Sequence, residues 1–240
     1  MSKIINHWEY GKPINSKRYF YTDSEFWNPL DGDSEELFDQ RQPPGWDKKD
    51  IRYTINSWGF RSPEFDLTGQ SKNIMTFGCS FTLGVGVDDN HTWPMQMRKF
   101  FSDYVIYNLG ISGCGSDTVT RLAINWIPIL KPDIVIVLWP NMYRFETYDN
   151  DPPRMHGVWS PENLMLNEFY KDENAYNNLM KNKIIFELIQ KVHGFKYVSE
   201  DFEVINNIFQ QDKAARDMSH PGPLWYGNLA DYFYKESQKL

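Results

Sequence analysis

The sequence predicts an α/β fold, a three-layer α/β/α sandwich with a mostly parallel central sheet, and three observations support it. Short apolar runs alternate with longer amphipathic segments from residue 73 onward. The connections between these runs can hold helices, which favours parallel strands joined by right-handed crossovers. Of the 240 residues, 41% are hydrophobic and 16% aromatic, which is enough to build a buried core. We expect this domain to cover residues 73–240.

Residues 1–72 differ from the rest of the chain in amino-acid composition and in the absence of periodic patterns. They are rich in aromatic residues, Pro, Asp and Asn, and they show neither helical nor strand periodicity. Because so many Trp, Tyr and Phe side chains are unfavourable in water, we predict an irregular arm that packs on the main domain. A separate N-terminal domain is the alternative interpretation.

Four apolar segments are expected to form the sheet. They cover residues 73–78, 104–110, 133–140 and, as a short fourth strand, 195–199. The third, DIVIVLWP, is almost entirely apolar, as expected for a strand that is covered on both faces of a parallel sheet.

Helices are expected over residues 92–102, 116–130 and 173–193, and from about residue 224 to the end of the chain. Thr92 can serve as the N-cap of the first, whose first turn accommodates a proline. The second has an apolar face at helical spacing. The segment between Asn141 and about Asp172 is predicted to be a long loop.

The charge balance excludes several classes of partner. The chain has 25 Lys and Arg against 32 Asp and Glu, a net charge of −7, which does not attract phosphate backbones or anionic lipids. No run approaches the roughly 18 apolar residues of a membrane span, and the first residues lack the apolar region of a signal peptide. We therefore expect a soluble, cytoplasmic protein without nucleic-acid or membrane partners; its oligomeric state stays open.

The cysteines and most histidines give no sign of a metal site. Cys79 and Cys114 are too few for a disulfide scaffold or a four-ligand zinc site. The following histidines have no partner at metal-ligand spacing: His7, His91, His156 and His193. The glycine-rich segments also lack a complete nucleotide-binding motif. We expect reduced, buried thiols, no metal and no cofactor.

The candidate functional residues follow the predicted strands. In open parallel sheets, functional groups gather at the carboxyl ends of the strands. Four blocks of sequence attract attention on this basis: GCSFT at 78–82, NLGISGCG at 108–115, WPN at 139–141 and, near the C-terminus, DMSH at 217–220.

The first and last blocks contain the side chains of nucleophilic catalysis. A serine hydroxyl becomes a good nucleophile when an imidazole accepts its proton, and a carboxylate orients that imidazole. Ser80, His220 and Asp217 can supply these three roles. The spacing of three residues between Asp217 and His220 allows one turn of backbone to bring carboxylate and imidazole together.

The four blocks together resemble the SGNH hydrolase superfamily, also called GDSL esterases and lipases. Its hallmark Ser, Gly, Asn and His occur in the same order, as Ser80, Gly113, Asn141 and His220. The resemblance covers residues 73 to about 235, and INSWGFRSPEF at 55–65 is similar to the lead-in of some members. It implies a flavodoxin-like fold and an oxyanion hole built from the backbone N–H groups of Ser80 and Gly113 and the side-chain amide of Asn141.

Two positions depart from the family pattern. Cys79 stands where the family usually has Asp before the nucleophile, and Trp139 stands where it usually has Gly. We expect Trp139 and Tyr143 to contact substrate, with the indole of Trp139 shortening the acyl pocket so that acetyl or propionyl esters are preferred over octanoyl and longer ones. The alternative places Trp139 in the packing layer of the sheet. Other aromatic residues have the same two interpretations: Phe145, Trp159 and Trp225.

Each candidate also has an ordinary structural explanation when it is taken alone. Ser80 and Asn141 can cap the segments that follow them, Gly113 can form a turn, and His220 can be an exposed loop residue. Their coincidence favours a serine esterase that acts on small acyl esters, such as O-acetyl groups on carbohydrate. The alternative is an SGNH-like domain without turnover that binds glycans or serves as a structural component.

Overall fold

The computed structural model describes residues 26–28, 32–147, 154–160 and 164–240. In chain order the main elements are α2 (Glu35–Arg41), β1 (Asn73–Phe77), α3 (Ser80–Leu83), α4 (Trp93–Gln96), β2 (Val105–Asn108), α5 (Ser116–Leu130), β3 (Ile134–Trp139), β4 (Phe145–Thr147), β5 (Arg154–His156), α6 (Leu164–Phe169), α7 (Asp172–His193), β6 (Lys196–Asp201), α8 (Phe202–Ile208) and α9 (Pro223–Ser237).

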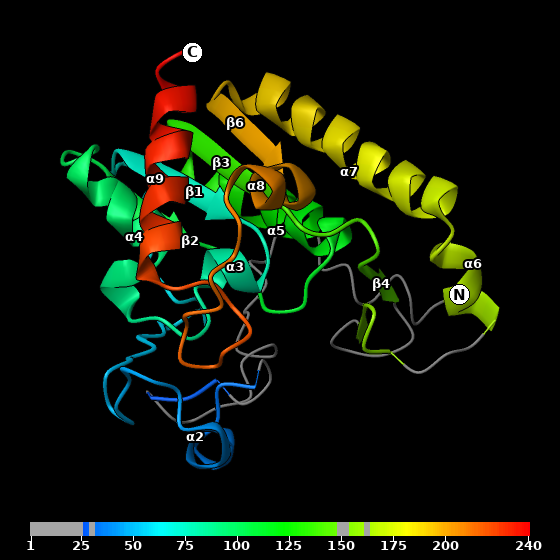
Figure 1. Cartoon of the computed structure of the whole chain (residues 1–240). Coiled ribbons are helices and arrows are strands. Elements are labelled where there is room, and N and C mark those ends of the chain that lie inside the picture. Colours follow the sequence, from blue (N-terminus) through cyan, green and yellow to red (C-terminus); the bar gives the residue numbers. More distant parts are fainter. Residues whose placement is uncertain (1–25, 29–31, 148–153, 161–163) are drawn as a thin grey trace.

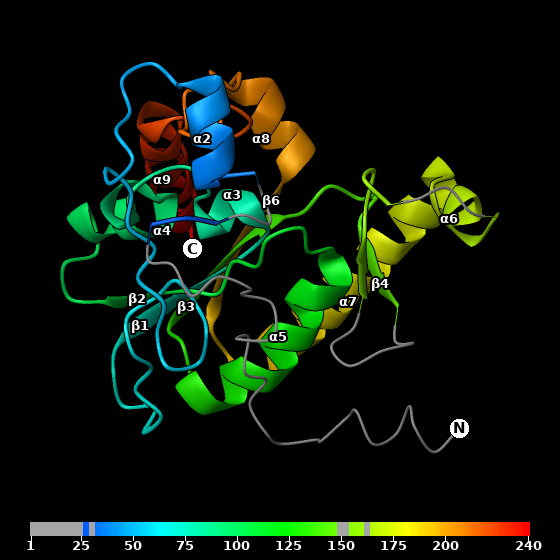
Figure 2. The ribbon, with the colours of Figure 1, turned by 90° about the horizontal axis from the view of Figure 1, so that it is seen from below.

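The central sheet is parallel, with strand order β2-β1-β3-β6. In register, Ile74 of β1 pairs with Ile106 of β2 on one side and Ile134 of β3 on the other. Helices α5 and α7 cover one face of the sheet, and α4 and α9 cover the other (Figures 1 and 2). The predicted three-layer sandwich is confirmed. No helix within the described ranges is both long and apolar enough to cross a bilayer.

Aromatic side chains fill both layers between sheet and helices. Phe77 and Trp139, at the ends of β1 and β3, pack edge-on against Phe186 of α7. On the opposite face, Trp93 of α4 packs against Phe233 of α9. Every residue of β1 and of β3 is buried, as expected for strands in the middle of a parallel sheet.

The segment predicted as one long loop contains additional elements. Strands β4 and β5 pair antiparallel, and α6 lies between β5 and α7. Each of these strands has three residues, too few for a two-residue periodicity to stand out. Residues 148–153 and 161–163 of the predicted loop lie outside the described residues. Helix α8, which follows β6 without a connecting loop, is also absent from the predicted elements.

The described part of the arm contacts the main domain. Apart from α2 it is irregular, and Phe60 and Phe65 join the core against Trp126 of α5. The buried guanidinium of Arg61 donates hydrogen bonds to the backbone oxygens of Gly84 and Val87 (2.5 and 2.8 Å), which follow α3. Residues 1–25 of the predicted arm lie outside the described part of the chain.

Candidate active site

Ser80 begins helix α3 directly after a tight exit from β1. Gly78 makes this exit possible, because a Cβ atom there would lie 2.1 Å from Oγ1 of Thr82 and 2.8 Å from the backbone oxygen of Leu138. Cys79 is the N-cap of α3, and Ser80 is its first residue. The hydroxyl of Ser80 is therefore fixed at the carboxyl end of a central strand.

The structure brings together Ser80, Asp217 and His220. Nε2 of His220 lies 2.9 Å from Oγ of Ser80, and Nδ1 lies 2.7 Å from Oδ2 of Asp217. The backbone N–H of His220 also donates to Oδ1 of Asp217 (3.2 Å). All three residues are buried. With Asp217 ionised, Nδ1 carries the proton of the neutral imidazole, so Nε2 accepts the proton of the serine hydroxyl.

The turn that carries Asp217 and His220 has an uncommon backbone conformation. Met218 has a φ of 57°, in the left-handed region that non-glycine residues seldom adopt. Two backbone hydrogen bonds close the turn, from Met218 N–H to the oxygen of Ala215 (2.9 Å) and from Ala215 N–H to the oxygen of His220 (3.2 Å). The ring of Phe81 packs beside the imidazole, with 5.0 Å between centroids.

Gly113 and Asn141 flank the strand that leads to Ser80. Gly113 follows β2 and Asn141 follows β3, and these are the two strands on either side of β1. Gly113 has a φ of 68°, which a side chain would disfavour. Oδ1 of Asn141 accepts the backbone N–H of Tyr143 (3.0 Å), which leaves the amide NH₂ as the donor available for another partner.

Cys79 and Cys114 are both free and buried. The Cys114 thiol donates to the backbone oxygen of Gly78 (3.3 Å), which ties the loop after β2 to the end of β1. Burial, and then the neighbouring Cys79, raises the pKa of the Cys114 thiol well above its usual value. The thiol is therefore protonated at neutral pH and acts as a small packing group and a hydrogen-bond donor.

The structure favours the second interpretation given for Trp139, a place in the packing layer of the sheet. Its indole is fully buried and packs against Phe186 of α7. In an all-apolar strand the sequence pattern does not reveal which face a given residue takes. Tyr143 is half-buried, and its hydroxyl donates to the carboxylate of Asp172 at the start of α7, which raises the pKa of the phenol.

Trp159 lies beside Gly113. A Cβ atom on Gly113 would be 3.5 Å from Cζ2 of the indole, and the residue is 52% exposed. The guanidinium of Arg144 lies over the indole, 5.2 Å from the ring centroid. The absence of a side chain at Gly157 makes room for the indole of Trp159, because a Cβ atom on Gly157 would lie 2.4 Å from the indole ring. Trp159 therefore offers partly exposed aromatic surface next to the loop that follows β2.

A second polar cluster fastens the loops that carry Gly113 and Asn141. Glu146 of β4 forms a buried ion pair with Arg121 of α5 and accepts a hydrogen bond from the hydroxyl of Thr118. The backbone N–H of Glu146 donates to Oδ2 of Asp117 (3.1 Å). Glu146 follows Asn141 by five positions, and Asp117 follows Gly113 by four. These contacts therefore join the loop after β3 to the start of α5.

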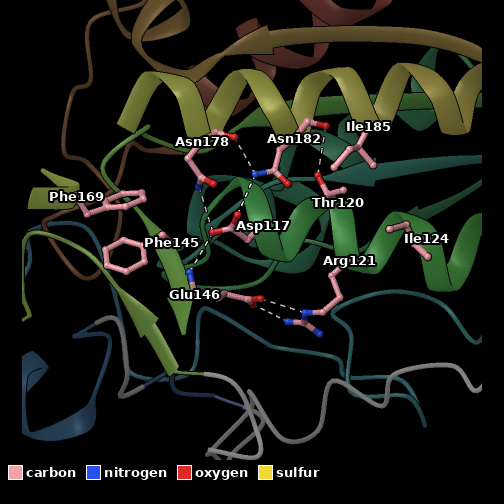
Figure 3. A pocket seen from close by; sticks show the side chains of 10 residues that line it. All are labelled: Asp117, Thr120, Arg121, Ile124, Phe145, Glu146, Phe169, Asn178, Asn182 and Ile185. Carbon is pink, nitrogen blue, oxygen red and sulfur yellow. Dashed lines mark hydrogen bonds and ion pairs between the residues drawn. The ribbon is translucent and has the colours of Figure 1, made fainter. Parts of the chain in front are cut away.

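This cluster lines a hollow of about 350 Å³ (Figure 3). Asn178 and Asn182 of α7 both point to Asp117 and donate to its carboxylate. Burial raises the pKa of Asp117 above its usual value, and the amide of Asn182 partly offsets this. None of the Ser80, Asp217 and His220 side chains lines this hollow, so it is distinct from their site. Within the described ranges, no group of three or more His, Cys, Asp or Glu could hold a metal ion.

Neither a protein-family model nor a curated protein matches this chain. Solved structures do. TesA matches with a TM-score of 0.40 and 13% identity, over 68% of this chain and 97% of its own. A putative lipolytic protein of the G-D-S-L family from Desulfitobacterium hafniense matches with a TM-score of 0.37 and 15% identity, over 70% and 99%. Est24, a carbohydrate acetylesterase from Sinorhizobium meliloti, matches with 0.35 and 12%, over 68% and 99%.

Of these three, one is thus a putative lipolytic protein of the G-D-S-L family and another a carbohydrate acetylesterase. Because their TM-scores are 0.40 or lower, the function proposed below rests on the side-chain geometry of this chain.

Proposed function

We propose that this protein is a serine esterase of the SGNH type, with Ser80 as nucleophile, His220 as general base and Asp217 as the carboxylate that orients the base. One observation supports this most strongly. The imidazole of His220 bridges the hydroxyl of Ser80 and the carboxylate of Asp217, at 2.9 and 2.7 Å. A hydroxyl, imidazole and carboxylate in this order are the arrangement that activates a serine for acyl transfer.

In the first half of the reaction, Oγ of Ser80 attacks the ester carbonyl carbon as its proton passes to Nε2 of His220. The carbonyl oxygen becomes an oxyanion, and Asp217 stabilises the imidazolium that forms. His220 then donates the proton to the departing alcohol, which leaves an acyl group on Ser80. In the second half, His220 removes a proton from water, the resulting hydroxide attacks the acyl-enzyme, and the free acid leaves as Ser80 regains its proton.

The oxyanion requires hydrogen-bond donors. We assign the backbone N–H groups of Ser80 and Gly113 and the side-chain NH₂ of Asn141 to this role. The strand order supports the assignment, because Gly113 and Asn141 follow the two neighbours of β1. In other enzymes, loss of one such donor raises the barrier by about 3–4 kcal/mol.

For the substrate, we favour small acyl esters on carbohydrate, such as O-acetyl groups. Trp159 supports this choice, because a partly exposed indole beside Gly113 presents a flat apolar surface of the kind on which a sugar ring can pack.

The nucleophile assignment is tested with p-nitrophenyl acetate and a fluorophosphonate probe. Ser80→Ala should abolish both hydrolysis and labelling while it leaves the melting temperature nearly unchanged. Ser102→Ala is the matched control, since Ser102 is exposed and lies away from the site; it should behave as wild type. Labelling that persists in Ser80→Ala would refute the assignment, and glycan binding without turnover by the wild type would favour a non-catalytic role.

A further inference from the structure

The arm contacts the turn that carries Asp217 through a buried ion pair. Nε and Nη2 of Arg216 donate to the two carboxylate oxygens of Asp33, at 2.9 and 2.8 Å. The side chains of the pair are 0% and 1% exposed. A buried, bidentate Arg–carboxylate pair fixes both distance and orientation, because the planar guanidinium matches the planar carboxylate.

Other parts of the arm surround the same guanidinium. Nη1 of Arg216 donates to the backbone oxygen of Lys48 (2.8 Å), and Nη2 also donates to that of Phe26. The guanidinium lies over the ring of Trp27, 4.1 Å from its centroid. Arg216 is therefore held almost entirely by arm residues, although it directly precedes Asp217 in the chain.

The arm also binds the backbone of this turn on both sides of Arg216. Nη1 of Arg41, the last residue of α2, donates to the backbone oxygen of Asp217 (2.7 Å). Nε1 of Trp46 donates to that of Ala214 (3.0 Å). Figure 1 shows α2 beside the loop that precedes α9, at the end of the sheet where α3 begins.

Tyr53 connects these contacts to the segment that follows α3. Its hydroxyl donates to Oδ2 of Asp33 (2.6 Å) and accepts the backbone N–H of Gly86 (2.8 Å). The backbone oxygen of Gly86 in turn accepts the N–H of Arg216 (2.9 Å). A Cβ atom on Gly86 would lie 2.7 Å from Oδ1 of Asp217, so this segment packs directly against the carboxylate.

We propose, on the basis of the esterase function above, that Asp33, Arg41 and Tyr53 of the arm are positioning residues that hold Asp217, and through it His220, in line with Ser80. The turn needs this support, because its own backbone supplies two hydrogen bonds, Met218 is in a left-handed conformation, and Met218 and Ser219 are exposed. Proton transfer from Ser80 depends on imidazole placement to within about 0.5 Å.

The kinetic test compares Tyr53→Phe and Asp33→Asn with wild type on p-nitrophenyl acetate. Both should lower kcat about 10-fold with little change in KM, because they disturb the base and not the binding surface. Tyr53→Phe preserves the ring and is expected to fold. Phe65→Leu is the matched control: Phe65 lies in the arm but packs against Tyr107 and Trp126, so this variant should lose stability without loss of kcat.

A double-mutant cycle separates positioning from general damage. If Tyr53 acts through Asp217, the loss caused by Tyr53→Phe should largely disappear when Asp217 is already alanine. An undiminished loss in the Asp217→Ala background would overturn the inference, and so would wild-type kcat in Tyr53→Phe and Asp33→Asn.

An NMR measurement does not depend on turnover. The proton on Nδ1 of His220, shared with Asp217, should give a downfield resonance that weakens or shifts in Tyr53→Phe and persists in Phe65→Leu. If this change occurs in a protein without Ser80-dependent esterase activity, the positioning role stands and the proposed function fails. If the esterase is active but the resonance and kcat match wild type in Tyr53→Phe, the positioning role fails alone.

Discussion

Nε2 of His220 lies 2.9 Å from Oγ of Ser80, although 140 positions separate the two residues in the chain. Asp217, in contrast, is three positions from His220 and accepts hydrogen bonds from both its backbone and its ring. The carboxylate and the imidazole therefore form one local unit, and the fold brings the nucleophile to it.

His220→Ala should lower kcat about as far as Ser80→Ala, on the order of 10⁶-fold, because nucleophile and base act in the same step. Asp217→Asn should be less severe, about 10⁴-fold, because the imidazole remains. Single-turnover measurements with an aryl acetate give these values. The Ser80→Ala, His220→Ala double variant should be no slower than either single variant; losses that multiply would contradict a shared step.

Trp139→Ala should destabilise the protein by about 3–5 kcal/mol, because it removes a fully buried indole and leaves a cavity against Phe186. The preference among acetyl, butanoyl and octanoyl esters should not change. Urea unfolding and an acyl-length series measure the two effects. A shift toward longer acyl chains would mean that the indole borders the acyl pocket after all.

Trp159→Ala should have the opposite profile. Little stability should be lost, because the side chain is about half exposed. KM for an acetylated xylo-oligosaccharide should rise several-fold, while KM for p-nitrophenyl acetate, which has no sugar, stays near wild type. Val158→Ala is the control, since Val158 is the exposed neighbour. An equal rise in KM for both substrates would argue against a sugar-packing role.

Glu146→Gln should lower kcat about 10-fold by loosening the tie between the loop after β3 and α5, and hence the placement of Asn141. It should also weaken binding of a boronic acid that mimics the tetrahedral intermediate. Stability should fall too, by about 3–5 kcal/mol, because the buried Arg121 guanidinium loses the carboxylate charge of Glu146 that faces it.

Two variants separate these effects. The double variant Arg121→Met, Glu146→Leu removes both charges and should regain much of the stability without regaining kcat. Leu130→Ala, at the far end of α5, should lose stability and keep wild-type boronate affinity. A kcat that returns together with stability in the double variant would show that Glu146 acts on stability alone.

Tyr197→Phe should make the protein more tolerant of alkaline conditions. Burial raises the pKa of Tyr197 to about 12 from an ordinary value of 10.0. Between these two values the folded state keeps a proton that the unfolded state releases, so stability falls as pH rises through this window. In this window wild type should lose about 2 kcal/mol of its free energy of unfolding that the variant retains. This is less than the full pKa shift implies, because the side chain is only half-buried and solvent screens it. Urea unfolding at pH 9 and 11.5 tests this; equal losses in both proteins would contradict it.

Local pattern was sufficient for the four strands of the central sheet and for helix α5, but not for the short elements β4, β5, α6 and α8. Helix α5 spans Ser116–Leu130, the range that its apolar spacing predicts, and the four apolar runs form the parallel sheet. The candidate site residues could be predicted from the sequence for a related reason: in a parallel sheet, residues that follow neighbouring strands converge at one edge. Ser80 therefore stood out by its place after an apolar run.

The features that the sequence did not reveal depend on long-range geometry. The direction of Trp139 is set by helix α7, which the all-apolar pattern of β3 does not encode. The tie between Glu146 and Arg121 depends on a three-residue strand too short to be recognised. The contacts between the arm and Arg216 produce no local sequence pattern, because Asp33, the ionic partner of Arg216, is 183 positions away in the chain.

That separation of 183 residues also bears on the order of folding. Residues paired in the central sheet are 32 to 62 positions apart in the chain, whereas the Asp33–Arg216 pair closes a loop that contains this whole sheet. Closure of so long a loop is entropically unfavourable until the intervening structure has formed, and long-range contacts slow folding. A refolding chain should therefore recover its far-ultraviolet circular dichroism before His220 is positioned to act as a base, and hence before esterase activity returns. In the interval it is native in secondary structure and catalytically immature.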